Sequence, residues 1–127
     1  MSQIVKADYP LSDVTARIIV AVTEVHRALG PGLEEVIYQR ALARELPAHQ
    51  LEFSREVWMD IRYKGVKMGS KRVDFVIDEV MVEIKAKALL EEVDFVQTLS
   101  YLKASGFKVG LLINFGAAKL QVKRLVN

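Results

Sequence analysis

One stretch of this chain, residues 72–85, constrains the fold more than any other. It holds two short runs rich in β-branched residues, 73–77 and 80–86, with only an Asp-Glu dipeptide between them. This pattern predicts an antiparallel hairpin in which the two acidic residues form the turn. In that register, Asp74 on the first strand faces Glu83 on the second.

Side chains alternate between the two faces of a strand, so the predicted hairpin has one apolar face and one polar face. The polar face carries Asp74, Glu83 and Lys85. Carboxylates whose Cβ atoms lie roughly 5 Å apart repel each other, and such a pair is destabilising without a positive partner. The apolar face, which we expect in the core, consists of Val73, Phe75, Ile77, Val80, Val82 and Ile84.

A divalent cation is the simplest partner for the acidic pair, but the sequence leaves two other arrangements open. Lys85 or Arg72 could neutralise the carboxylates without a metal. Asp-Glu is also not one of the favoured two-residue turns, so a longer loop with a register shifted by one residue is compatible with the sequence. The hairpin alone therefore suggests an acidic site without establishing its chemistry.

The composition is that of one soluble globular domain covering residues 1–127. Hydrophobic residues make up 51% of the chain and charged residues 27%, which argues against disorder. A formal charge of +2 neither requires nor excludes nucleic acid as a partner. The absence of cysteine excludes disulfides, thiolate zinc sites and a cysteine nucleophile. No signal peptide or membrane-spanning run is visible, so we expect a cytoplasmic protein with no membrane partner.

The remaining periodicities predict helices and strands in the order α-α-β-β-β-α-β-β. This order implies a helical crossover between two parallel strands, and hence a mixed sheet flanked by helices. The expected elements are a leader over residues 1–11, helices at about 12–29 and 33–46, a strand at 52–63, a turn region at 64–69, the hairpin, a helix at 89–105, and strands at 107–115 and 120–126.

The second and third helices each have a polar strip beside a predicted apolar stripe. Glu35 and Tyr38 share a face of the second helix, and Asp94, Gln97 and Tyr101 share a strip of the third. Without further context these are polar margins of amphipathic helices, and an early Glu suits the helix dipole. The inward residues are expected to be Leu33, Val36, Ile37, Ala41 and Leu42 on the second helix, and Leu90, Val93, Val96, Leu99 and Leu102 on the third.

Taken together, these residues resemble the PD-(D/E)xK nuclease superfamily, in which an Asp and an Asp/Glu-x-Lys lie on adjacent strands of a small mixed sheet. Asp74 and the run Glu83-Ile84-Lys85 match that motif. The whole chain, over residues 14–126, resembles more narrowly the GxxExxY proteins. The resemblance implies an α+β fold with a restriction-endonuclease-like core. Its further matches are Gly32, Glu35 and Tyr38 at the three named positions, then Tyr63-Lys64-Gly65, Arg72-Val73-Asp74 and residues 110–116.

The resemblance also implies a role for each residue of the site. Lys85 would orient or help deprotonate the attacking water and offset charge on the phosphate. Family members often carry His where this chain has Asp94, and the connection at residues 47–51 is shorter than expected. The ligands of Mg²⁺ or Mn²⁺, ions that prefer oxygen, would be Asp74, Glu83, Glu35 and the backbone carbonyl of Ile84. The residues supporting the site or contacting substrate would be Gln97, Tyr101, Tyr38 and Arg72.

The implied activity is metal-dependent hydrolysis of phosphodiester bonds, with DNA favoured over RNA as the nucleic-acid substrate. A chain of this size has no room for a separate target-recognition module, so we expect action on structures or strand ends, and a homodimer is compatible with this expectation. The alternative is a nucleic-acid-binding or protein-interaction module that keeps the fold without cleaving. The basic residues best placed to meet phosphates are Lys64, Lys67, Lys71, Arg72, Lys85 and Lys87.

Overall fold

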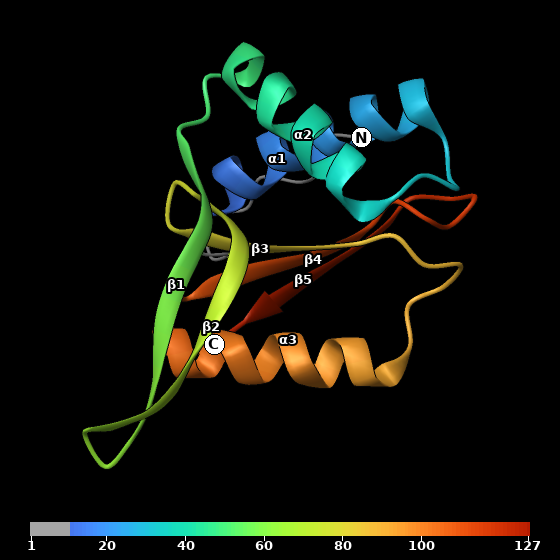
Figure 1. The fold of residues 1–127 in the computed structure, drawn as a ribbon. Helices are drawn as coiled ribbons and strands as arrows, with labels where there is room; N and C mark the ends of the chain where they lie inside the picture. The colour runs from blue at the N-terminus through green and yellow to red at the C-terminus, as the bar shows by residue number, and fades with distance from the viewer. Residues whose placement is uncertain (1–10) are drawn as a thin grey trace.

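The computed structural model describes residues 11–127, so the expected leader at 1–11 falls outside it except for Leu11. The order of elements confirms the predicted one (Figure 1). No helix of the described residues is long and apolar enough to cross a membrane. The elements are α1 (Ser12–Leu29), α2 (Glu35–Glu45), the 3-10 helix η1 (Leu46–His49), β1 (Phe53–Tyr63), β2 (Val66–Ile77), β3 (Val80–Lys85), α3 (Glu92–Ser105), β4 (Val109–Asn114) and β5 (Gln121–Val126).

The five strands form one mixed sheet in the order β1-β2-β3-β4-β5. β3 and β4 are parallel, whereas the other three neighbouring pairs are antiparallel. A parallel pair needs a crossover connection, and α3 supplies it between β3 and β4. The mixed sheet flanked by helices confirms the predicted α+β fold.

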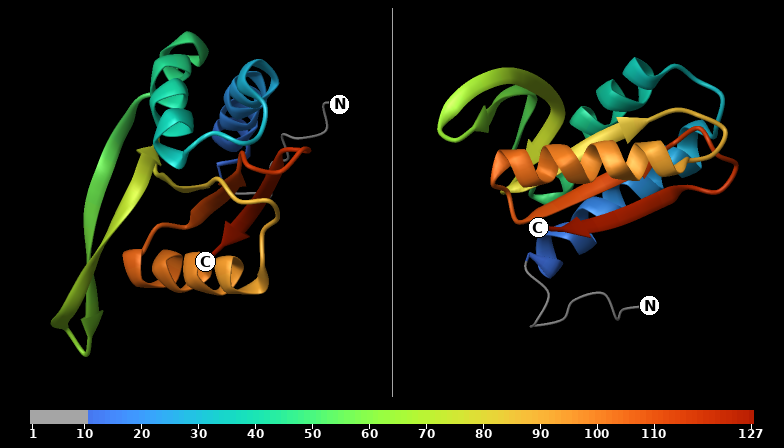
Figure 2. Two further views of the ribbon diagram at one scale, coloured as in Figure 1. Left: turned by 45° about the vertical axis from the view of Figure 1, so that its right-hand side comes forward. Right: turned by 90° about the horizontal axis from the view of Figure 1, so that it is seen from below.

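Helices cover both faces of the sheet. α1 and α2 lie on one side and α3 lies on the other (Figures 1 and 2). β3 and β4 run between these layers and are buried along nearly their whole length. The larger core, between the sheet and the α1–α2 layer, includes Ile18, Val22, Leu42, Phe75, Val82 and Ile113. The smaller core, on the α3 side, consists of Met59, Val73, Met81 and Leu102.

The central hairpin has the register that the sequence predicts. Residue 77 pairs with residue 80 and residue 75 with residue 82, which leaves Asp78 and Glu79 as a two-residue turn. Their φ angles are 44° and 72°. Positive φ at both central residues belongs to the type I′ turn, whose twist matches that of the flanking strands. The longer loop and the shifted register are therefore both excluded.

Val73 departs from its predicted face. The expectation that it shares a face with Phe75 is wrong, because Val73 packs with Met59 toward α3, whereas Phe75 packs toward α1 and α2. The alternation breaks between these residues: the β1–β2 register skips Asp74 and the residue opposite it, Glu56, whose φ is 53°. The side chains of β2 on either side of Asp74 therefore contact different cores, on opposite faces of the sheet.

β1 and β2 form an arm that extends past the other strands (Figure 1). The turn predicted at 64–69, with a short extension, is confirmed but is shorter than expected, because Lys64 and Gly65 close the hairpin alone and the extension from Val66 belongs to β2. Positive φ angles of 51° and 80° at these two residues are sufficient for the reversal. β2 pairs with β3 only over residues 75–77, so residues 57–72, called the outer arm below, pair with each other.

The predicted start and inward face of the second helix are partly wrong. α2 begins at Glu35, two residues later than expected, and Leu33 and Val36 are exposed. Tyr38 and Leu42 are the buried residues of the helix. The Tyr38 hydroxyl donates to the carbonyl of Gly30 at 2.5 Å and accepts from the Leu33 N–H at 3.1 Å. These bonds draw the Tyr38 face inward and keep the preceding loop extended.

The predicted inward face of the third helix is also partly wrong. α3 begins at Glu92 instead of residue 89, and Val93 and Val96 are exposed. The reason is a capping box at the start of the helix, in which the side chains of Glu91 and Asp94 each bond the other's backbone N–H. This arrangement turns Asp94 inward, with Thr98 and Leu102 following on the same face.

Candidate active site

The acidic pair lies where β2 separates from β3. Past the last ladder pair, the Asp74 N–H donates to Glu83 Oε1 at 3.0 Å, and the Ile84 N–H donates to Asp74 Oδ2 at 2.7 Å. The two side chains thus accept from backbone donors at the point where the ladder ends. The structure brings together Asp74 and Glu83 in the fork between the strands, and each carboxylate uses one oxygen in these bonds.

The environment of the pair disfavours two negative charges. Burial raises the pKa of Asp74, against the lowering effects of the Ile84 N–H and of Lys71 and Lys85. Burial also raises the pKa of Glu83, which is only 5% exposed, and the charge of Asp74 raises it further. Burial therefore outweighs the nearby positive charges at both carboxylates.

Two lysines lie beside the acidic pair, and they differ in whether they contact a carboxylate. Lys71 Nζ is 3.5 Å from Glu83 Oε2 and 5.0 Å from the centre of the Tyr101 ring, so it bridges β2, β3 and α3. Lys85 lowers the pKa of both carboxylates, yet no carboxylate among residues 11–127 lies within 4 Å of its ammonium group. Sequence reasoning named Lys71 as a basic residue but missed its contact with Glu83, which only the pairing of strands could reveal.

Glu35 faces the acidic pair from the α1–α2 layer. It is the first residue of α2, and its side chain is exposed. Partial loss of water around the carboxylate and the charge of Asp74 raise its pKa, while Lys85 and Lys71 lower it. Gln39 Nε2 donates to Glu35 Oε1 at 3.2 Å. Glu35 is thus electrostatically coupled to the residues of the fork.

The residues predicted to support the site or contact substrate lie in different environments. Tyr38 is fully buried, stacks on Phe115 with ring centres 4.8 Å apart, and anchors the loop before Glu35. Gln97 is exposed on α3, and no side-chain hydrogen bond joins it to the rest of residues 11–127. Arg72 Nη1 lies 3.8 Å from Glu56 Oε2 on the outer side of the arm, and its charge lowers the pKa of Asp74.

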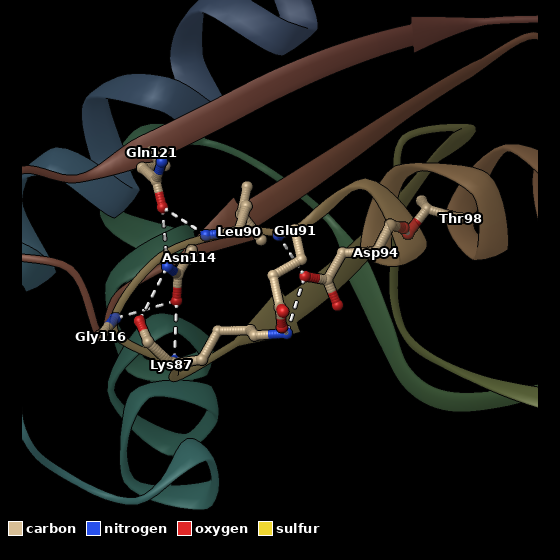
Figure 3. Close-up of polar contacts among 8 residues, drawn as sticks. All are labelled: Lys87, Leu90, Glu91, Asp94, Thr98, Asn114, Gly116 and Gln121. Atoms are coloured by element: carbon tan, nitrogen blue, oxygen red, sulfur yellow. Dashed lines mark hydrogen bonds and ion pairs between the residues drawn. The ribbon is translucent and has the colours of Figure 1, made fainter.

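A buried amide fixes the chain just beyond Lys85 (Figure 3). Asn114 accepts from the N–H groups of Lys87 at 3.0 Å and Gly116 at 3.1 Å, and donates to the Lys87 carbonyl at 2.9 Å. It also donates to Gln121 Oε1, which accepts the N–H of Leu90. A polar residue at the end of a buried apolar strand was the signal for this network in the sequence, and sequence reasoning missed it.

Asp94 belongs to the same region and has a structural role (Figure 3). Its Oδ2 accepts from the Glu91 N–H at 2.8 Å and from Lys87 Nζ at 2.9 Å. Burial alone would raise the pKa of Asp94, but the Glu91 N–H and Lys87 outweigh it and hold the pKa below its usual value. The Asp94 carboxylate is therefore already neutralised by Lys87.

The oxygen donors at the fork fit a hard divalent cation. No group of three or more His, Cys, Asp or Glu side chains converges within residues 11–127. Mg²⁺, however, is commonly held by one or two carboxylates and retains several waters. Asp74 and Glu83 supply two such groups, and burial raises both of their pKa values, so a bound cation would favour their ionised forms. The backbone carbonyl of Ile84 and the carboxylate of Glu35 are further candidate ligands.

Comparisons with known proteins identify a shared fold and a family. A solved chain described as "Crystal structure of SSO0001" superposes with a TM-score of 0.56 at 19% identity, which shows a shared fold. The match covers 92% of this chain and 59% of that one, so this chain spans less than two thirds of its neighbour. No curated protein sequence matches the chain. The family model described as the PD-(D/E)XK nuclease superfamily matches residues 12–125, and the chain therefore belongs to that superfamily.

Proposed function

We propose that this protein is a Mg²⁺- or Mn²⁺-dependent nuclease that hydrolyses phosphodiester bonds in DNA. Membership of a nuclease superfamily supports the reaction class. The observation that carries the proposal is the placement of Asp74 and Glu83, which meet in the fork of the sheet, where burial raises both pKa values and Lys85 acts on both carboxylates. Gly32, Glu35 and Tyr38 support assignment to the GxxExxY branch.

The residues in and around the fork have different proposed roles in the reaction. The proposed metal ligands are Asp74, Glu83, the carbonyl of Ile84 and, directly or through water, Glu35. When bound, such a cation lowers the pKa of water and offsets negative charge on a phosphate. Lys85 has no carboxylate partner among residues 11–127, so its ammonium group is available to orient the attacking water or the phosphate. Lys71 positions the Glu83 carboxylate through their 3.5 Å contact.

We further propose that the enzyme acts on strand ends or DNA structures. The described residues form one sheet with its helices, and no separate recognition module is present among them. Contacts with phosphates position a protein without reading sequence, and the cations around the fork are suited to such contacts. Lys71 and Arg72 precede Asp74 on β2 by three and two residues.

Calorimetric titration with Mn²⁺ is the primary test. Wild type should bind the ion, and Asp74→Asn and Glu83→Gln should lose that binding, while the exposed acid Glu92→Gln serves as the matched control. In the same buffers, wild type should cleave at least one of single-stranded, duplex or branched DNA, and Lys85→Ala should bind DNA without cleaving it. RNA of the same sequences tests the preference for DNA.

The outcome that contradicts the proposal is equally specific. If wild type binds no Mn²⁺ even with DNA present, and cuts none of these substrates, the fork is not a nuclease site. Retained DNA binding under those conditions, unaffected by Asp74→Asn, would instead support a non-catalytic nucleic-acid-binding module.

A further inference from the structure

The positive charge of the chain is concentrated on the outer arm, residues 57–72. This segment holds five basic residues and one acidic residue, a net charge of +4. The other residues hold 13 basic and 15 acidic side chains, a net charge of −2. The small overall charge of +2 thus conceals a strongly basic arm on an acidic body. Such a separation of charge is the electrostatic footprint of a nucleic-acid-binding surface.

The arm also exposes aromatic side chains among its cations. Trp58 is 65% exposed, and the guanidinium carbon of Arg72 lies 5.9 Å from its ring centre. Tyr63 is 62% exposed, and Lys64 Nζ lies 5.4 Å from its ring centre. Aromatic rings interleaved with basic side chains are the arrangement that binds single strands, because unpaired bases stack on the rings while cations meet the phosphates.

Packing of the protein core does not explain the exposed position of Trp58. Its neighbours Val57 and Met59 face the smaller core toward α3, so alternation directs Trp58 to the opposite, solvent-facing side of the arm. An indole left in water forgoes about 2 kcal/mol or more of burial free energy. An occupant that covers the ring would recover that free energy.

The arm is continuous with the proposed active site. Trp58 is paired with Arg72 across the ladder, and Arg72 is two residues from Asp74 on the same strand. Lys71, also of the outer arm, contacts Glu83. A strand lying along the arm toward its base would therefore arrive at the fork between β2 and β3. Figure 2 shows that the tip of the arm projects beyond α3, with no other helix or strand beside it.

We propose that the outer arm binds single-stranded nucleic acid, with an unpaired base stacked on Trp58 beside the fork. The inference deepens the proposed function by naming the form of the substrate, and rests on that function only for the position of the cut. A second copy of the chain is a poorer occupant, because two arms of net charge +4 would repel each other on contact.

Trp58 supplies its own probe because it is the only tryptophan in the chain. The experiment titrates Asp74→Asn protein, which should not cleave, with an oligothymidylate, an oligouridylate and a blunt duplex of equal length. The single strands should quench the Trp58 fluorescence and the duplex should not. Adding Trp58→Ala should weaken single-strand binding about tenfold by fluorescence anisotropy, whereas Trp58→Phe should keep most of the affinity. Leu89→Ala, which alters a side chain that is also 65% exposed, is the matched control.

Three outcomes overturn the inference. The first is unchanged affinity in Trp58→Ala, and the second is equal quenching by the duplex. The third is a dimer in sedimentation that Trp58→Ala dissociates, which would assign the ring to a second copy. If single strands quench Trp58 but wild type cleaves no substrate, the proposed function is refuted and this inference stands. If wild type and Trp58→Ala cleave equally well, this inference is refuted and the proposed function stands.

Discussion

At the scale of single residues, the structure buries two neighbouring carboxylates whose ionised forms burial disfavours. Asp74 and Glu83 hold each other's strands through backbone N–H groups, yet both pKa values are raised. A group whose native pKa lies above its unfolded value binds protons on folding, so stability falls as the pH rises from about 4 through the native pKa. At neutral pH the ionised pair is therefore destabilising without a cation.

Replacing Glu83 with Gln should stabilise the metal-free protein at pH 7 by about 1 kcal/mol, because it removes one of two facing charges. The advantage should shrink as the pH falls toward 4, where wild-type Glu83 becomes protonated. Chemical denaturation in the presence of a chelator measures both effects, with the exposed acid Glu52→Gln as control. Mn²⁺ should stabilise wild type and leave the variant unchanged. A variant less stable than wild type at pH 7 would mean that the contact with Lys71 outweighs the repulsion.

At the scale of elements, the sequence predicted what local patterns encode. The order of elements, the hairpin register and the residues of the fork follow from alternation along neighbouring strands. The inward faces of α2 and α3 do not, because they are decided by partners far away or outside the helix. Asp94 faces inward because Lys87 and the capping box neutralise it, and hydropathy alone assigns that place to Val93. The contact between Lys71 and Glu83 likewise depends on how β2 turns at Asp74.

The Asp78-Glu79 turn joins β2 to β3 with residues that are not those favoured in a type I′ turn. Both residues adopt positive φ without being Asn or Gly. The double variant Asp78→Asn, Glu79→Gly should stabilise the protein by about 1 kcal/mol, because these residues suit a type I′ turn. Thermal unfolding tests the gain, and Mn²⁺ affinity should not change. Destabilisation would show that the acidic side chains contribute contacts beyond the turn geometry.

The connection from β3 to α3 depends on Asn114. Asn114→Ala should lower the free energy of unfolding by roughly 3 kcal/mol, because it leaves buried N–H and carbonyl groups of the connection without partners. Hydrogen exchange should accelerate first at Lys87 and Leu90, whose N–H groups the network protects. Gln97→Ala, which removes an exposed amide on α3, is the matched control and should change neither quantity. Unchanged exchange at Lys87 would show that the connection is held by other contacts.

At the scale of the whole molecule, the fold separates two tasks. The layered body places the fork between two cores, and the outer arm carries the positive charge away from the acidic body. Gly116 shows how closely the body is fitted near the site, since a Cβ there would lie 2.4 Å from the backbone nitrogen of Lys87. Charge can be changed on the arm without disturbing such packing, because all of its cations except Lys71 are exposed.

That separation predicts how nucleic-acid binding depends on salt. Neutralising Arg62, Lys64 and Lys67 together, each to Gln, should weaken binding of a single strand and reduce the slope of log K against log salt concentration by about 2, since each phosphate contact contributes about 0.7. The control neutralises Lys103, Lys108 and Lys119, three exposed lysines outside the arm, and changes the net charge by the same amount. If affinity followed net charge alone, the two triple variants would behave alike. A reduced slope confined to the arm variant would mean that phosphates are met on the arm, so that the strand reaches the fork from that side.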